Sequence, residues 1–322
     1  MLTMAISPIL ATLVTVAASV APTPAPDGRI PLAALREATL DVPGWPADNV
    51  RGPSGPLRFH DGSVTIEPRE TPDGQPPYAQ SVTILSAAYG DVDRDGADET
   101  VVLLGALIEG GSKQLVAYDR DRAGHIVALG RVAATTGEVR DIRADSARVD
   151  AAGAVSALVG DYQRCCDDDT PQIWQTRSYA LRDGRFEQVG GPTRMPLNPH
   201  VTQTRVTAGK LALGAATGGY RYGTVDVTLT HRRGAHPEKI TLWFYPPDGL
   251  ERTGAGWPAV TTRPDGFGVT VPAPPAGGSV THTFGFRRPA ALSGGELSLE
   301  ITTAPPMGQA LPWDSSAAAP VS

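Results

Sequence analysis

Short apolar runs separated by turn residues recur along most of the 322-residue chain, and they limit what it can fold into. Glycine and proline number 36 and 30, and both residues interrupt helices and favour turns. Short runs repeated every ten to fifteen residues or so are typical of antiparallel β structure. Hydrophobic residues make up 41% of the chain, which suffices for packed cores. We therefore expect a mainly β protein with few long helices.

The pattern divides the chain into two modules. Residues 30–191 predict an α+β module, in which one short helix precedes a β-meander. Two glycines directly before residue 192 and three prolines after them predict that residues 192–200 form a linker. Residues 201–303 contain seven short strand-like runs, several with strict alternation, which predict an immunoglobulin-like β-sandwich. Residues 304–322, rich in Ala, Pro and Ser, are expected to form a disordered tail.

The amino-terminal segment indicates the cellular compartment in which the protein works. Residues 1–21 are apolar and uncharged, and residues 22–29 form a proline-rich spacer. An apolar run that ends in small residues is typical of a secretory signal peptide. No basic residue precedes the run, which leaves an uncleaved anchor open, and a buried core helix is a third interpretation. We expect export to the cell envelope or extracellular space, with at most a single N-terminal membrane segment.

The balance of acidic and basic residues limits the kinds of partner that the protein can bind. The chain has 28 basic and 34 acidic residues, a net charge of −6. A nucleic-acid-binding protein needs a basic face, so nucleic acid is not an expected partner. Arginine accounts for 25 of the basic residues, and this bias suggests a GC-rich genome.

The most specific local pattern is an aspartate-rich loop with the sequence DVDRDGADE. Asp91, Asp93 and Asp95 alternate along it before a glycine that permits a sharp turn. Calcium prefers six to eight oxygen ligands, and such a loop wraps carboxylates around one point. We predict a structural Ca²⁺ ion held by these three residues, Glu99 and the carbonyl of Ala97. The alternative is a plain turn whose carboxylates cap backbone N–H groups and face water.

The residues around this loop define its type. An EF-hand needs a bidentate glutamate at position 12, and that residue is Val102, inside a strand-like run. A strand followed by D-x-D-x-D-G-x-x-[DE] and a second strand resembles the calcium loop of FG-GAP and VCBS-type repeats of extracellular β-rich proteins. The resemblance implies calcium binding, with Glu99 standing where that family usually has aspartate. One copy does not make a propeller, which needs several regular repeats.

Cys165 and Cys166 are the only cysteines, and they are adjacent. Their Cα atoms are separated by about 3.8 Å across a trans peptide, below the usual range for a disulfide. A vicinal disulfide that stiffens the loop, two thiols, and intermolecular bonds all remain open. A redox-active site is not expected, because the three aspartates that follow disfavour a thiolate.

Several stretches of the first module together resemble a group of uncharacterised secreted proteins of actinobacteria. The region after the linker resembles bacterial surface immunoglobulin-like repeats. The resemblance implies export and a two-part β-rich build, and it implies no known reaction. The stretches are residues 30–46, 89–102, 113–132, 160–174 and 183–199.

Motifs for catalysis are scarce. The sequence contains no G-x-S-x-G elbow, no Walker loop and no H-E-x-x-H. Tyr220, Tyr222, Trp243 and Tyr245 fit either core packing or an exposed platform for sugars. We expect an exported non-catalytic protein that binds an envelope component or an extracellular glycan or protein. The alternatives are an accessory or catalytic protein of extracellular polysaccharide metabolism, with a carboxylate site in the first module, and a structural spacer.

Overall fold

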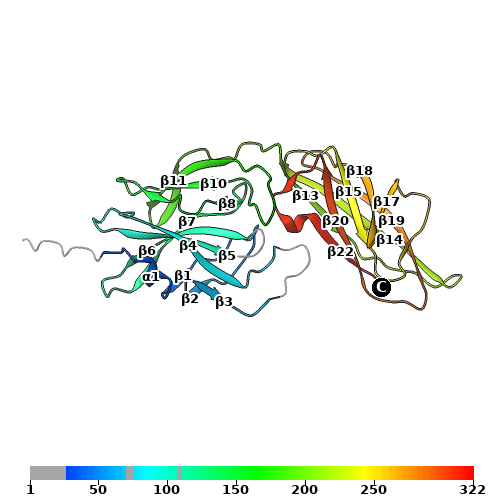
Figure 1. Ribbon diagram of the computed structural model, residues 1–322, viewed down its shortest axis with the longest axis horizontal. Coiled ribbons are helices and arrows are strands. Elements are labelled where there is room, and N and C mark those ends of the chain that lie inside the picture. Colours follow the sequence, from blue (N-terminus) through cyan, green and yellow to red (C-terminus); the bar gives the residue numbers. More distant parts are fainter. Residues whose placement is uncertain (1–26, 70–75, 107–110) are drawn as a thin grey trace, which may run out of the picture.

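The computed structural model describes residues 27–69, 76–106 and 111–322. The expected signal segment, residues 1–21, and most of the spacer at 22–29 lie outside these ranges. Within them, no helix is long and apolar enough to cross a membrane. Figure 1 shows two modules side by side along the long axis of the molecule.

The first module consists of short strands and one four-residue helix. A sheet of order β3-β4-β5-β6-β7 packs on a second five-stranded sheet that contains β8 to β12, and β1 and β2 form a separate pair. Its elements are α1 (Leu32–Leu35), β1 (Thr39–Val42), β2 (Gly55–Arg58), β3 (Ser63–Thr65), β4 (Ser81–Gly90), β5 (Glu99–Ala106), β6 (Ser112–Arg120), β7 (Ile126–Ala134), β8 (Asp141–Ile142), β9 (Arg148–Val149), β10 (Val155–Gly160), β11 (Trp174–Arg182) and β12 (Arg185–Gly190).

Strand β5 lies at the centre of the first module and is buried along its whole length. Val102 and Leu104 face a core shared with α1 and β1. Val101 and Leu103 face the core between the two five-stranded sheets. Because both faces are covered, the strand reads as a continuous apolar run rather than an alternating one.

The second module is a sandwich of two five-stranded sheets, with strand orders β16-β19-β14-β13-β21 and β17-β18-β15-β20-β22. Its single core takes side chains from both sheets, including Phe284 from β19 and Phe244 from β15. Its elements are β13 (Val201–Ala208), β14 (Tyr220–Gly234), β15 (Lys239–Tyr245), β16 (Glu251–Arg252), β17 (Val260–Arg263), β18 (Gly266–Pro272), β19 (Ser279–Pro289), β20 (Glu296–Ala304), β21 (Gly308–Gln309), η1 (Pro312–Ser315) and β22 (Ser316–Pro320).

The expected fold class is confirmed. The described residues are mainly β, and two mainly antiparallel sheets packed face to face around one core form an immunoglobulin-like sandwich in the second module.

The prediction of a disordered tail at residues 304–322 is wrong. Strand β22 pairs antiparallel with β20, with Ala319 opposite Leu297, and Ala319 is fully buried. The short strand β21 pairs with β13 on the other sheet. A composition that suggests disorder is therefore here the composition of an ordered edge strand, with one residue, Ala319, in the core.

Candidate metal centre

The aspartate-rich loop closes the hairpin between β4 and β5. The two strands pair antiparallel up to Gly90 opposite Glu99, so the loop begins and ends at one point of the sheet. Gly96 has a φ of 95°, a conformation that glycine adopts without steric cost. The loop therefore folds back on itself and brings its first and last residues together.

Glu99 holds the loop from inside. The residue is fully buried, and its Oε2 atom accepts hydrogen bonds from the N–H groups of Val92 at 2.6 Å and Asp93 at 3.3 Å. The other carboxylate oxygen, Oε1, is buried and has no hydrogen-bond partner among the described residues. A buried oxygen of a carboxylate without a partner is costly, which makes it a candidate ligand atom.

Asp91 and Asp93 join Glu99 in a cluster of three carboxylates. One oxygen from each of the three lies within 4.8 Å of the others. Ligands of a single Ca²⁺ ion at about 2.3–2.6 Å stand at separations of this order. Asp91 Oδ2 accepts a hydrogen bond from Gly96 N at 3.2 Å, whereas its Oδ1 is buried and unpartnered within the described ranges. We refer to Asp91, Asp93 and Glu99 as the carboxylate trio.

The two other predicted ligands are not part of the trio. The Oδ1 atom of Asp95 accepts a hydrogen bond from Ala97 N at 2.9 Å, and Asp95 is exposed. Its own N–H donates to Asp93 Oδ1 at 3.1 Å. Asp95 and Ala97 thus shape the turn, as the plain-turn alternative expects, while the trio gathers beneath it.

The electrostatics of the trio disfavour three negative charges. Burial, with the charges of Asp93 and Asp119, raises the pKa of Glu99 to about 7 despite its two backbone hydrogen bonds. Burial first, and then the neighbouring aspartates, also raise the pKa of Asp93. A divalent cation would reverse both effects, because it favours the charged form of every carboxylate around it.

Asp119 is a further acidic residue of this site that the sequence pattern missed. Strands β5 and β6 pair with Thr100 opposite Tyr118, so the next residues along the two strands are Glu99 and Asp119, and the charge of Asp119 acts on Glu99. Burial and the charge of Asp95 raise the pKa of Asp119. The signal that finds this residue is the pairing of the two apolar runs, which sequence spacing alone does not reveal.

The amino-terminal segment covers the site. Thr100 Oγ1 accepts a hydrogen bond from Ile30 N at 2.8 Å and donates one to the carbonyl of Gly28 at 2.9 Å. A side chain at Gly28 would collide with the carboxylate of Asp119. Nη1 of Arg29 lies 3.5 Å from Oδ2 of Asp98, so a positively charged side chain stands at the edge of the loop.

The two cysteines lie in the loop after β10. The Sγ atoms of Cys165 and Cys166 are 2.6 Å apart, and Cys166 is exposed with a φ of 55°. In the same loop, the hydroxyl of Tyr162 donates a hydrogen bond to Asp168. The vicinal disulfide stays a prediction.

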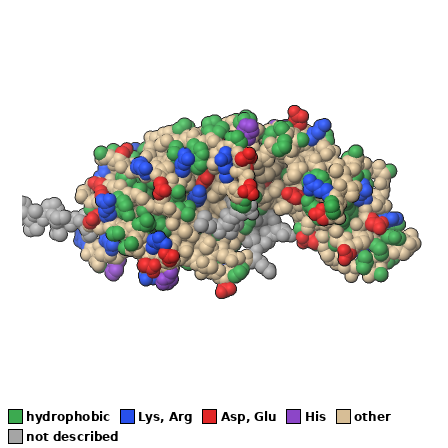
Figure 2. Space-filling model, in the orientation of Figure 1, with side chains coloured by type: hydrophobic (Ala, Val, Ile, Leu, Met, Phe, Trp, Pro, Cys, Tyr) green, Lys and Arg blue, Asp and Glu red, His purple; other side chains and the backbone are tan. Residues whose placement is uncertain are grey.

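The four aromatic residues do not form one platform. Tyr220 and Tyr222 lie on β14, whereas Trp243 and Tyr245 lie on β15 of the other sheet. The guanidinium of Arg263 stacks 3.3 Å from the centre of the Trp243 ring and covers it. On the face in Figure 2, acidic and basic side chains are interspersed over both modules.

Comparisons with known proteins are sparse. No protein-family model matches the sequence, and no curated protein matches it. Among solved structures, the chain is similar over part of its length to a non-cellulosomal cohesin from the hyperthermophilic archaeon Archaeoglobus fulgidus. The identity is 13% and the TM-score 0.26, over 37% of this chain and 90% of the cohesin chain. A similarity of this extent carries no functional information.

Proposed function

We propose that this chain is an exported, non-catalytic protein of the cell envelope or extracellular space, stabilised by a structural Ca²⁺ ion in the loop between β4 and β5. The observation that carries the proposal is the carboxylate trio, in which two buried oxygens, Asp91 Oδ1 and Glu99 Oε1, have no hydrogen-bond partner among the described residues. Hard carboxylate oxygens are the ligands that calcium prefers.

The role of the ion would be structural. The backbone of the loop lies against the β9–β10 turn, where a side chain at Gly153 would lie 2.9 Å from Val92 O and 3.0 Å from Asp91 O. An ion between the carboxylates would fix this loop, and through it the contact between the two sheets of the first module. The partner that the whole protein binds is, in this proposal, an envelope component or an extracellular glycan or protein.

Calorimetry of the protein with Ca²⁺ and with EDTA tests the calcium site. A ligand at a hundredfold excess over its Kd adds about 2.7 kcal/mol to the folded state. For a module of this size, that corresponds to a rise in Tm of about 5–10 °C. Glu99→Gln should lose this response while unfolding no lower than the wild type in EDTA, because the substitution also removes a buried charge.

Asp121→Asn is the matched control. Asp121 Oδ1 accepts hydrogen bonds from Ala123 N and His125 N, both at 2.9 Å, in the exposed turn between β6 and β7. This variant should keep the full response to Ca²⁺. Identical wild-type transitions with Ca²⁺ and with EDTA would contradict the calcium site.

A further inference from the structure

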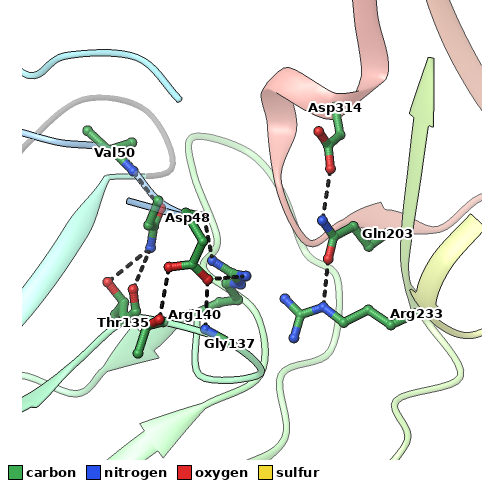
Figure 3. A network of polar contacts seen from close by, with 10 residues as sticks. Asp48, Val50, Thr135, Gly137, Arg140, Gln203, Arg233 and Asp314 are labelled. Atoms are coloured by element: carbon green, nitrogen blue, oxygen red, sulfur yellow. Dashed lines mark hydrogen bonds and ion pairs between the residues drawn. The ribbon is translucent and has the colours of Figure 1, made fainter. Parts of the chain in front are cut away.

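A polar cleft lies where the two modules meet. Its volume is about 400 Å³, and side chains from both modules line it. The first module contributes Asp48 and Arg140, and the second contributes Arg205, Arg233 and Asp314. Figure 3 shows Asp48 and Arg140 on one side of the junction and Arg233 and Asp314 on the other.

Arg140 forms the wall on the first module. Its side chain is only 4% exposed. Its Nη1 donates to Asp48 O at 3.2 Å and its Nη2 to Asp48 Oδ2 at 3.3 Å. The Nε–H group is buried and has no partner among the residues that the structure describes. The Asp48 carboxylate also accepts hydrogen bonds from Thr136 Oγ1 and Gly137 N, both at 2.8 Å.

Arg233 forms the wall on the second module. Its Nε donates to Gln203 Oε1 at 2.6 Å, and Gln203 Nε2 in turn donates to Asp314 Oδ2 at 2.9 Å. This chain of bonds holds the guanidinium in place, as Figure 3 shows. The Nη2 group of Arg233 is buried without a partner within the described part of the chain.

The two guanidinium groups repel each other. Burial, followed by the charge of Arg233, lowers the pKa of Arg140 to about 10. Both groups nevertheless carry a positive charge at neutral pH, and each has a buried N–H that no described residue accepts. Such donors are costly unless an acceptor satisfies them.

The carboxylates of the cleft do not supply that acceptor. Four arginines line the cleft, against three acidic residues. Each acidic residue already contacts a different arginine: Asp48 contacts Arg140, Glu138 contacts Arg194, and Asp314 contacts Arg205. Burial lowers the pKa of Arg233, and the charges of Glu138, Asp48 and Asp314 partly offset this effect. None of the described carboxylates accepts a hydrogen bond from the Nη2 group of Arg233, which leaves that group available to a ligand.

We propose that the cleft binds an oxyanion of the phosphate or sulfate type between Arg140 and Arg233. Guanidinium groups bind such anions through charge-assisted hydrogen bonds. The two groups approach from opposite modules, and a tetrahedral anion presents oxygens in both directions, whereas a planar carboxylate offers its two oxygens to one side. The bound group links the modules, and the cleft has room for a phosphate ester as well as for the free ion.

Isothermal titration calorimetry of the full chain tests this site. Inorganic phosphate is titrated in a buffer with EDTA, at an ionic strength held constant with NaCl, and glycerol 1-phosphate and acetate are titrated in parallel. We expect saturable binding of one phosphate per chain and none of acetate. Tighter binding of glycerol 1-phosphate identifies the ligand as a phosphate ester, and its exclusion identifies the free anion.

Substitutions locate the site. Arg233→Gln should weaken phosphate binding about tenfold or more, because it removes a charged donor. Arg233→Lys should weaken it too, since a lysine keeps the charge but not the fork of donors. Arg252→Gln, on the edge strand β16 of the same sheet and outside the lining of the cleft, should leave binding unchanged.

Three results would overturn the proposal: no saturable phosphate binding by the wild type, equal binding of acetate, or unchanged binding by a folded Arg233→Gln protein. The wild-type titrations decide the question even if the variants do not fold. The calcium proposal is independent of this outcome, because its ligands lie on a different loop.

Discussion

At the scale of single residues, His231 illustrates how hydrogen bonds fix one protonation state. The side chain is buried, and its Nε2 lies 3.2 Å from Ala235 O while its Nδ1 lies 3.3 Å from Gly277 N. Since a carbonyl only accepts and an N–H only donates, the ring must be neutral with its proton on Nε2. Burial, with the neighbouring His236, accordingly lowers the pKa of His231.

This pKa makes stability depend on pH. The unfolded chain binds the proton near pH 6.5, whereas the folded protein binds it only at lower pH. The free energy of unfolding should therefore fall as the pH drops through about 6.5, by at most about 1.4 kcal/mol per pH unit, and level off below the folded-state pKa. Urea denaturation between pH 7.5 and 5.5 should show a smaller acid-induced loss in His231→Gln than in the wild type.

The exposed His125 provides the control for this prediction. His125→Gln should follow the wild-type pH profile, because its ring lies in solvent beside Asp121. Other titrating groups, such as Glu99, contribute equally to all three proteins and cancel in the comparison. Parallel profiles for His231→Gln and the wild type would show that His231 does not contribute.

At the scale of elements, the end of β4 shows how close the two sheets of the first module come. A side chain at Gly90 would place its Cβ 2.5 Å from Cβ of Val149 on β9, well inside van der Waals contact. Gly90 also precedes the first residue of the carboxylate trio. The position of the aspartate-rich loop therefore depends on a residue without a side chain at this contact.

Gly90→Ala should destabilise the first module by about 1–3 kcal/mol, the usual cost of an overpacked contact. Adding Val149→Ala should recover part of this loss, because it removes the Cγ1 and Cγ2 atoms that the new methyl group would meet at 2.8 and 3.2 Å, although the Cβ atom remains. Gly44→Ala in the same module is the control, since a Cβ there meets nothing within 4 Å. Denaturant unfolding measures all four proteins, and a Gly90→Ala protein as stable as the wild type would refute the close contact.

The candidate site was predictable to the extent that it is local. Asp91, Asp93 and Glu99 belong to one short loop, so their spacing was enough to suggest that they meet. Asp119 comes from the next strand, and only the register of β5 with β6 places it beside Glu99. Asp95 fits the same spacing, but its side chain accepts a hydrogen bond from its own turn instead. Spacing does not distinguish a ligand from a residue that caps the backbone.

At the scale of the whole molecule, the sequence predicted the β class because alternation and turn residues are local signals. The junction between the modules is not local. Arg140 precedes β8 and Arg233 is the second-last residue of β14. No pattern of either segment indicates that the two side chains meet. Their juxtaposition follows from how the modules pack, and so does the cleft between them.

The last strand gives the sharpest test of the whole fold. Ala319 on β22 is fully buried in the core of the sandwich, whereas Ser316 at the start of the same strand is exposed. Ala319→Asp would bury a charge without a partner and should cost about 3 kcal/mol or more. Ser316→Asp should change the free energy of unfolding by no more than about 0.5 kcal/mol.

Calorimetry separates these outcomes, because two modules can unfold in two transitions. Ala319→Asp should lower the transition of the second module and spare the first. If the tail were disordered, as its composition suggests, both aspartate variants would unfold like the wild type. Equal transitions for all three proteins would therefore show that β22 is not part of the sandwich. They would also contradict the placement of η1 and Asp314 in the wall of the cleft between the modules.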